Sequence, residues 1–163
     1  MENGQIKEFL REKLNFSNQS IQKLEIFLKI LLKYNSKYNL IAKSTEKIAW
    51  ERHILDSAQI LRLFNRDIRE ISDLGTGAGF PGVIISIYDE KDKFHVKLYE
   101  KSSVKRQFLE NMNKYSEHIR IAMHSSPQDA LGGWPTHYRA SKQWRKSVLA
   151  SPVQVPNKSF NET

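Results

Sequence analysis

The chain has 163 residues, which is enough for one domain with a hydrophobic core. It has no cysteine, which excludes disulfides and thiolate metal sites, and no apolar run approaches the roughly 18 residues of a membrane helix. The start of the chain lacks the features of a secretory signal, so we expect a cytoplasmic protein. A net charge of +8 suits a polyanionic partner such as RNA, although a lysine-rich surface would give the same value.

Two amphipathic helices are predicted first. Apolar residues from Ile6 to Leu14 recur at helical spacing, and a longer apolar stripe runs from Ile21 to Leu32 after a cap at Ser17 or Asn18. The chain is expected to turn at Asn39. Tyr38 and Asn39 are expected to have a structural role and not to contact RNA.

A third helix is expected after a cap at Ser44 or Thr45, with Ile48, Ala49 and Trp50 facing inward. Farther along, His53 and Asp56 are three residues apart and share a helical face. Two such ligands are too few for a metal site. An ion pair or a capping interaction is one interpretation of this pair, and a role in shaping a nearby pocket is the other.

The segment ISDLGTGAGFPG, residues 71–82, predicts a short strand, a glycine turn and the start of a helix. Ile71 and Leu74 supply the apolar strand. The glycines at 75, 77 and 79 let the backbone adopt positive φ and approach a ligand closely. Backbone N–H groups at such a helix start favour an anionic or carboxylate-bearing ligand. The segment therefore predicts a nucleotide or nucleoside cofactor site.

The glycines fit two cofactor signatures. Gly77, Gly79 and Gly82 match the G-x-G-x-x-G pattern of dinucleotide-binding folds. Counted from Gly75, where the turn begins, the pattern is the G-x-G-x-G of Rossmann-like methyltransferases that bind S-adenosylmethionine. The glycine spacing alone leaves both cofactors open.

A second strand is predicted over residues 94–99, and it ends at Glu100. An acidic residue about 20 residues beyond a glycine loop, at the end of the second strand, is positioned to accept the ribose hydroxyls. Both classes of cofactor fold share this device. Glu100 therefore indicates a ribose and does not indicate a reaction.

A further helix and strand complete the recognisable pattern. Ser102 or Ser103 can cap a helix that faces inward through Val104, Phe108, Leu109 and Met112, and its cations are either RNA contacts or a solvated face. Residues 118–123 read as a third strand. Alternating strands and helices predict an α/β fold with a parallel sheet.

Four motifs together resemble one family. They are YNLIA at 38–42, RHILDS at 52–57, DLGTGAGFPG at 73–82 and YEKSSVKRQFLE at 99–110. In this order they resemble the glucose-inhibited division protein B family, also called RsmG, over about residues 5 to 123. Members are bacterial enzymes that methylate N7 of a guanine in 16S ribosomal RNA.

The resemblance implies a Rossmann-like S-adenosylmethionine-dependent methyltransferase fold preceded by N-terminal helices. It also implies the small ribosomal subunit as partner. We further expect a monomer without membrane attachment and no metal site. The implied cofactor-binding residues are Asp73, Gly75, Gly77, Gly79, Phe80 and Glu100. Asp73 would orient the loop or reach the amino-acid end of the cofactor, and Glu100 would hold the ribose. No catalytic residue is assigned, because guanine N7 offers a lone pair and needs no general base.

The pattern breaks after the third strand. Residues 124–163 hold four of the five prolines, two of the three tryptophans and no isoleucine. We expect an N-terminal helical part at 1–66, the first half of the methyltransferase core at 67–123, and an atypical, disordered or non-native tail at 124–163. The family's acidic residue after strand three and its arginine near the end of strand four have no match here.

We hypothesise that the reading frame is truncated, with residues from about 124 read in a shifted frame. Translating the other two frames beyond codon 123 tests this, and finding no apolar strand pattern in either would refute it. Three functions stay open: a ribosomal-RNA methyltransferase of reduced or absent activity, a non-catalytic cofactor- or RNA-binding remnant, and a nicotinamide-dependent oxidoreductase. The last rests on the dinucleotide spacing alone, since no catalytic Tyr-x-x-x-Lys spacing follows.

Overall fold

The computed structural model describes residues 1–64, 68–89, 95–113 and 121–124. These ranges belong to the first of two compact units, Met1–Leu131. The tail predicted from residue 124 lies outside the described residues except for its first residue, and the division of the chain at 66 and 123 stays a prediction. No helix within the described ranges is both long and apolar enough to cross a bilayer.

Two N-terminal helices form as predicted. Helix α1 spans Asn3–Leu14 and helix α2 spans Asn18–Tyr38, and the apolar stripe of each is buried. The hydroxyl of Ser17 caps α2 by accepting the N–H of Ser20 at 2.9 Å. Asn39 ends α2 in the left-handed conformation, with φ of 49°, as expected of a C-capping asparagine.

The chain is helical after Ser44 and Thr45 as predicted, but it does not form a single α-helix. The chain instead forms a 3₁₀ helix η1, Lys43–Ile48, a π-helical turn η2, Trp50–Leu55, a short α3, Asp56–Ala58, and a second 3₁₀ helix η3, Gln59–Leu63. Because these windings differ in residues per turn, inward positions do not follow the α-helical period. Ala49 and Trp50 are buried as expected, whereas Ile48 is 45% exposed.

The described residues that follow include three parallel strands, in the spatial order β1-β2-β3. Strand β1 spans Glu70–Leu74, β2 spans His95–Tyr99 and β3 spans Ile121–His124. Leu74 lies opposite Tyr99, so β1 and β2 end at the same edge of the sheet. The parts predicted for these strands at 94 and 118–120 lie outside the described residues.

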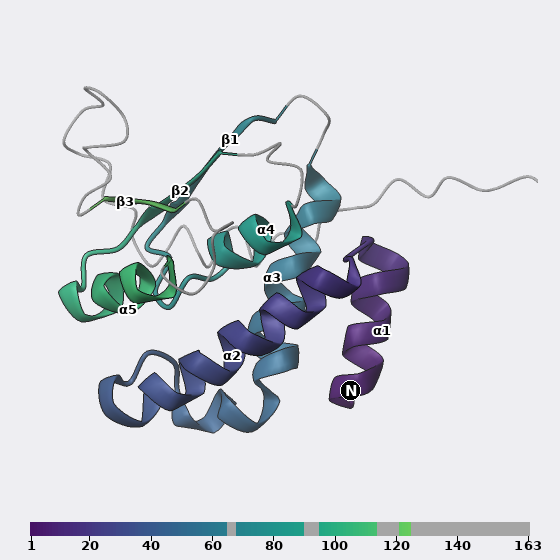
Figure 1. The fold of residues 1–163 in the computed structure, drawn as a ribbon, viewed down its shortest axis with the longest axis horizontal. Coiled ribbons are helices and arrows are strands. Elements are labelled where there is room, and N and C mark those ends of the chain that lie inside the picture. The colour runs from purple at the N-terminus through teal and green to yellow at the C-terminus, as the bar shows by residue number, and fades with distance from the viewer. Residues whose placement is uncertain (65–67, 90–94, 114–120, 125–163) are drawn as a thin grey trace, which may run out of the picture. The chain divides into compact units, whose positions relative to one another are not determined.

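Helix α4, Gly82–Tyr88, joins β1 to β2, and helix α5, Ser103–Asn113, joins β2 to β3. Both lie on the same side of the strands (Figure 1), as two right-handed crossovers in one direction require. Phe108, Leu109 and Met112 of α5 are buried as predicted, but Val104 is 40% exposed.

Helix α2 packs against both crossover helices. Its Phe27 ring lies 5.6 Å from the ring of Phe80 and 6.3 Å from that of Phe108. The buried hydroxyl of Ser20 donates to the carbonyl of Ile87 at 2.9 Å. The N-terminal helices and the strand-helix units therefore share one core, and the predicted α/β fold with N-terminal helices is confirmed.

Candidate cofactor site

The glycine loop lies over the carboxyl ends of β1 and β2. The N–H groups of Gly75 and Thr76 both donate to the carbonyl of Tyr99, at 2.7 and 3.1 Å. The N–H groups of Gly79 and Phe80 both donate to the carbonyl of Thr76, at 3.0 Å. The first pair anchors the loop on β2, and the second folds it back towards α4.

The predicted positive φ is found at all three glycines, at 76°, 63° and 103° for residues 75, 77 and 79. Their surroundings differ. A Cβ on Gly77 would have nothing within 4 Å, whereas a Cβ on Gly79 would overlap Val83 and lie 3.0 Å from Leu109. Gly77 therefore presents bare backbone to open space, and Gly79 allows the loop to pack closely on α4 and α5.

Asp73 is the buried residue of β1, with 9% exposure, while the flanking Leu74 is 38% exposed. The predicted strand through Ile71 and Leu74 is formed, with Leu74 partly exposed at its end. Asp73 Oδ2 accepts the N–H of Gly82, the first residue of α4, at 2.8 Å. This contact supports the first role expected for Asp73, that of orienting the loop, and its second expected role stays a prediction.

Glu100 follows β2 directly, and its carboxylate binds backbone N–H groups of the glycine loop and of the segment before α5. Its Oε2 accepts the N–H of Gly77 at 2.8 Å, and its Oε1 accepts the N–H of Ser102 at 2.7 Å. A carboxylate has about four acceptor positions. Two therefore stay available after these contacts within the described residues, which suits two neighbouring ribose hydroxyls.

Arg106 fixes the segment around Glu100 from the next helix. Its Nη1 donates to the carbonyls of Glu100 and Lys101, at 2.9 and 2.7 Å. The sequence left RNA contact and solvation open for this cation, and its two backbone contacts are a further role that was not foreseen. An arginine six residues after the acidic position was the only signal in the sequence, and it did not specify a backbone contact.

Thr76 was missed by the sequence analysis. Its side chain is buried, and its hydroxyl has no hydrogen-bond partner among the described residues. A buried hydroxyl without a partner costs about 1 to 3 kcal/mol. Its position between Gly75 and Gly77 was the available signal in the sequence, because a side chain between two turn glycines lies at the centre of the loop.

His53 links the RHILDS motif to the loop by stacking on Phe80, with ring centroids 5.0 Å apart and planes at 25°. Its Nε2 lies 2.8 Å from the hydroxyl of Thr45, which donates its one proton to the carbonyl of Ala42 at 2.7 Å. The ring N–H of His53 must therefore donate to Thr45.

Burial and the neighbouring positive charge of Arg52 lower the pKa of His53, and the carboxylate of Asp56 opposes them. Asp56 forms an exposed ion pair with Arg52 at 3.6 Å and none with His53. The predicted ion pair thus involves a different cation. No group of three histidines, cysteines or acids that could hold a metal is found in the described ranges.

All six residues predicted to bind a cofactor lie in this loop or beside it. The open face at Gly77 and the available acceptor positions of Glu100 fit a nucleoside. Phe80 is held from behind by Phe27 and His53. That these six predicted residues bind a cofactor stays a prediction.

Comparison with known proteins identifies the family. Residues 20–125 match the GidB family model, described as rRNA small subunit methyltransferase G. The chain is 40% identical over 114 residues to ribosomal RNA small subunit methyltransferase G of Orientia tsutsugamushi strain Ikeda, an alignment covering 69% of this chain and 56% of the relative. The corresponding protein of Rhodospirillum rubrum is 36% identical over 119 residues, covering 73% and 57%.

The protein of the same name from Pelagibacter ubique is 38% identical over 104 residues, covering 61% of this chain and 49% of the relative. The chain thus spans about half the length of the curated relatives it matches. The matched region includes the loop whose spacing fitted two signatures, and it favours the methyltransferase one. The resemblance of the four motifs is confirmed, and the chain belongs to the GidB family, rRNA small subunit methyltransferase G.

Proposed function

We propose that this chain binds S-adenosylmethionine at the glycine loop and serves N7-methylation of a guanine in 16S ribosomal RNA. The observation that carries the proposal is the Glu100 carboxylate, held at the end of β2 by the N–H groups of Gly77 and Ser102. It stands beside Gly77, where an added Cβ would meet nothing within 4 Å. Family membership supplies the reaction class.

Each loop residue has a defined task in this proposal. Glu100 accepts the ribose hydroxyls with its remaining lone pairs, and Gly77 lets the ligand approach the backbone. Asp73 holds the start of α4 in place, so that the loop keeps its shape without ligand. Phe80, stacked on His53, gives the loop an immobile aromatic wall.

The bound cofactor would supply an electrophilic methyl group. Because guanine N7 has a lone pair of its own and would lose no proton on methylation, the protein needs no general base. The chain's contribution is to hold the two reacting atoms in line, which avoids the entropic cost of a bimolecular encounter. Basic residues would attract the RNA backbone in a salt-dependent way.

Calorimetric titration of the full chain with S-adenosylhomocysteine tests the cofactor site. We expect micromolar binding that Gly77→Val abolishes and Glu100→Ala weakens about tenfold or more, because hydrogen bonds to a charged acceptor are lost. Gly4→Ala is the matched control, because a Cβ there also meets open space and the site is on α1. Absence of binding by folded protein would refute the proposal.

Methyl transfer to small ribosomal subunits that lack the modification tests the reaction itself. Transfer of a labelled methyl group that depends on Glu100 would establish the enzyme. Cofactor binding without transfer would leave the non-catalytic remnant as the better description of this chain.

A further inference from the structure

One face of α2 carries a row of lysines. Lys29, Lys33 and Lys37 follow one another at intervals of four residues and all three are exposed. Residues four apart on a helix are neighbours on its surface. At 1.5 Å per residue, the row extends about 12 Å along the helix axis.

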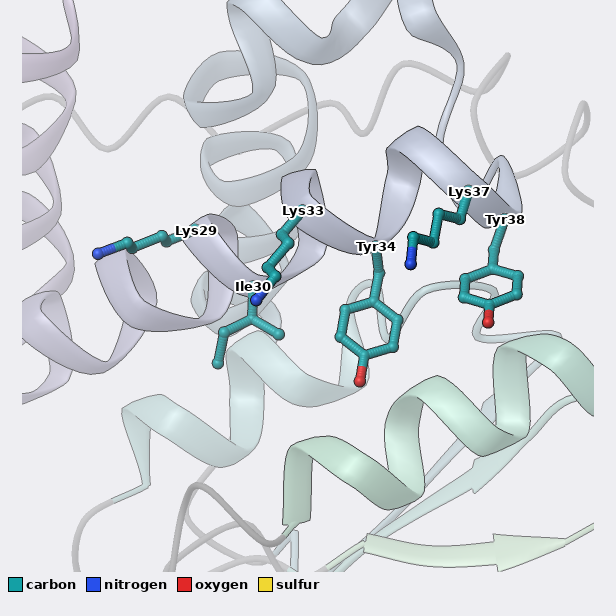
Figure 2. Close-up of a pocket in the computed structure, with 6 residues that line it drawn as sticks. All are labelled: Lys29, Ile30, Lys33, Tyr34, Lys37 and Tyr38. Atoms are coloured by element: carbon teal, nitrogen blue, oxygen red, sulfur yellow. The ribbon is translucent and has the colours of Figure 1, made fainter.

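The lysines border a groove of about 500 Å³, which Ile30, Tyr34 and Tyr38 complete. Figure 2 shows both tyrosine rings projecting from the same side of α2, with Lys33 and Lys37 near them and Lys29 extending away from them. Tyr38 is 48% exposed, so part of its ring is accessible to a ligand, and the structural role expected for it stays a prediction. The rings of Tyr34 and Tyr38 lie 6.0 Å apart at 31°, so they form a short aromatic row parallel to the lysines.

Among the residues that the structure describes, no ion pair involves the lysine row. The side-chain ion pairs found within the described ranges join Lys7 to Glu25, Arg52 to Asp56 and Lys97 to Glu70. None involves the three groove lysines. Three neighbouring cations without acidic partners in the described part of the chain attract a ligand with repeated negative charges.

The groove is built on the same core as the cofactor loop. Tyr34 packs on Phe108 of α5 with ring centroids 5.4 Å apart, and α5 begins three residues after Glu100. Phe27, on the preceding turns of α2, packs on Phe80 of the loop. A ligand in the groove would therefore be held in a fixed relation to the loop.

We propose that this α2 groove binds a single-stranded segment of RNA, with phosphates on the lysine row and a base on the exposed ring of Tyr38. Lysines alone would suit any polyanion, but alternation with exposed aromatic faces suits unpaired bases, which stack on such rings. In a duplex the bases are stacked on one another and do not offer these faces. The choice of RNA rests on the proposed function.

Fluorescence anisotropy with a labelled 12-nucleotide single-stranded RNA, and with the same RNA as a duplex, tests this. The variant Lys29→Gln/Lys33→Gln/Lys37→Gln should reduce the slope of log K against log salt by about 2, since each phosphate contact on a single strand contributes about 0.7. The control is Lys13→Gln/Lys43→Gln/Lys47→Gln, which removes three exposed lysines of α1 and η1. It lowers the net charge of +8 by the same three units.

Tyr38 separates stacking from charge. Tyr38→Ala should weaken single-strand binding about tenfold and leave the salt slope unchanged, whereas Tyr38→Phe keeps the ring and should bind as the wild type does. Equal losses in the two triple variants, a preference for the duplex, or an inert Tyr38→Ala would each overturn the proposal. Binding to anionic phospholipid vesicles and not to RNA would also overturn it.

Titration of the same variants with S-adenosylhomocysteine keeps the two proposals apart. The groove triple variant should bind this ligand as the wild type does, because its substitutions lie outside the loop. RNA binding that depends on the groove, in a protein that does not bind the ligand, would refute the proposed function and support the groove. If the protein binds S-adenosylhomocysteine but its RNA binding does not depend on the groove lysines, the proposed function is supported and the groove proposal is refuted.

Discussion

Gly77 and Gly79 are two residues apart in one loop, yet the structure predicts opposite consequences for the same substitution. In Gly77→Ala the new methyl group enters open space, so the cost is the backbone conformation alone. With φ of 63°, close to the left-handed helical value, that cost is about 1 to 2 kcal/mol. In Gly79→Ala the φ of 103° lies farther from the left-handed helical value, so the backbone cost is at least as large. It combines with overlap of Val83, and overpacking adds about 1 to 3 kcal/mol.

We therefore expect Gly79→Ala to lower the free energy of unfolding by about 2 to 5 kcal/mol and Gly77→Ala by about 1 to 2 kcal/mol. Urea denaturation measures both. With a slope of about 2 kcal/mol per molar urea, the midpoints should fall by about 1 to 2.5 M and by about 0.5 to 1 M. Gly4→Ala, in a helix and at ordinary φ, should be neutral or stabilising by up to about 1 kcal/mol.

Cofactor affinity should reverse this order. The Cβ of Gly77→Ala occupies the space that the ligand would use, so this variant should lose S-adenosylhomocysteine binding while it is still folded. Gly79→Ala, measured where it is folded, should keep most of the affinity, because its Cβ points to the core. Equal destabilisation of the two variants, or stronger loss of binding in Gly79→Ala, would refute the assignment of the two glycines.

Two further predictions concern the support of the loop. Phe27→Ala should lower the free energy of unfolding by about 3 to 5 kcal/mol in urea denaturation, because its ring is 1% exposed and lies between Phe80 and Phe108. The control Ile26→Ala, at a 52% exposed position, should change this free energy by less than about 0.5 kcal/mol. Similar losses in the two variants would contradict the shared core. Because the pKa of His53 is lowered by folding, the unfolded chain takes up the proton first, and thermal stability should fall as the pH drops below about 6.5. His53→Gln should make this fall shallower between about pH 7.5 and 5.5, and an unchanged pH dependence would show that His53 does not contribute.

The periodic parts of the fold could be predicted from the sequence. The stripes of α1 and α2 obey the helical period over several turns, and positive φ at three closely spaced glycines follows from their lack of a Cβ. Glu100 could be placed because the ends of parallel strands meet at one edge. These features depend on local pattern and sheet geometry alone.

The irregular and paired features could not be predicted. The segment from Lys43 to Leu63 changes its winding several times, so Ile48 is exposed where an α-helical period buries it. Hydrogen bonds between residues far apart in the sequence give no local sign, and the contact of Ser20 with Ile87 is one example. For the same reason, the stacking of His53 on Phe80 could not be predicted from the sequence.

The two acidic residues of the site differ in what they leave for a ligand. Asp73 is buried and holds the backbone of Gly82, so its charge is directed into the protein at the start of α4. Glu100 is only partly buried and holds Gly77 and Ser102 through one acceptor position of each oxygen. Since a carboxylate can accept more hydrogen bonds than these two, Glu100 can bind hydroxyl groups without releasing the loop. The loop is thus shaped by the protein before any ligand arrives, which lowers the ordering cost of binding.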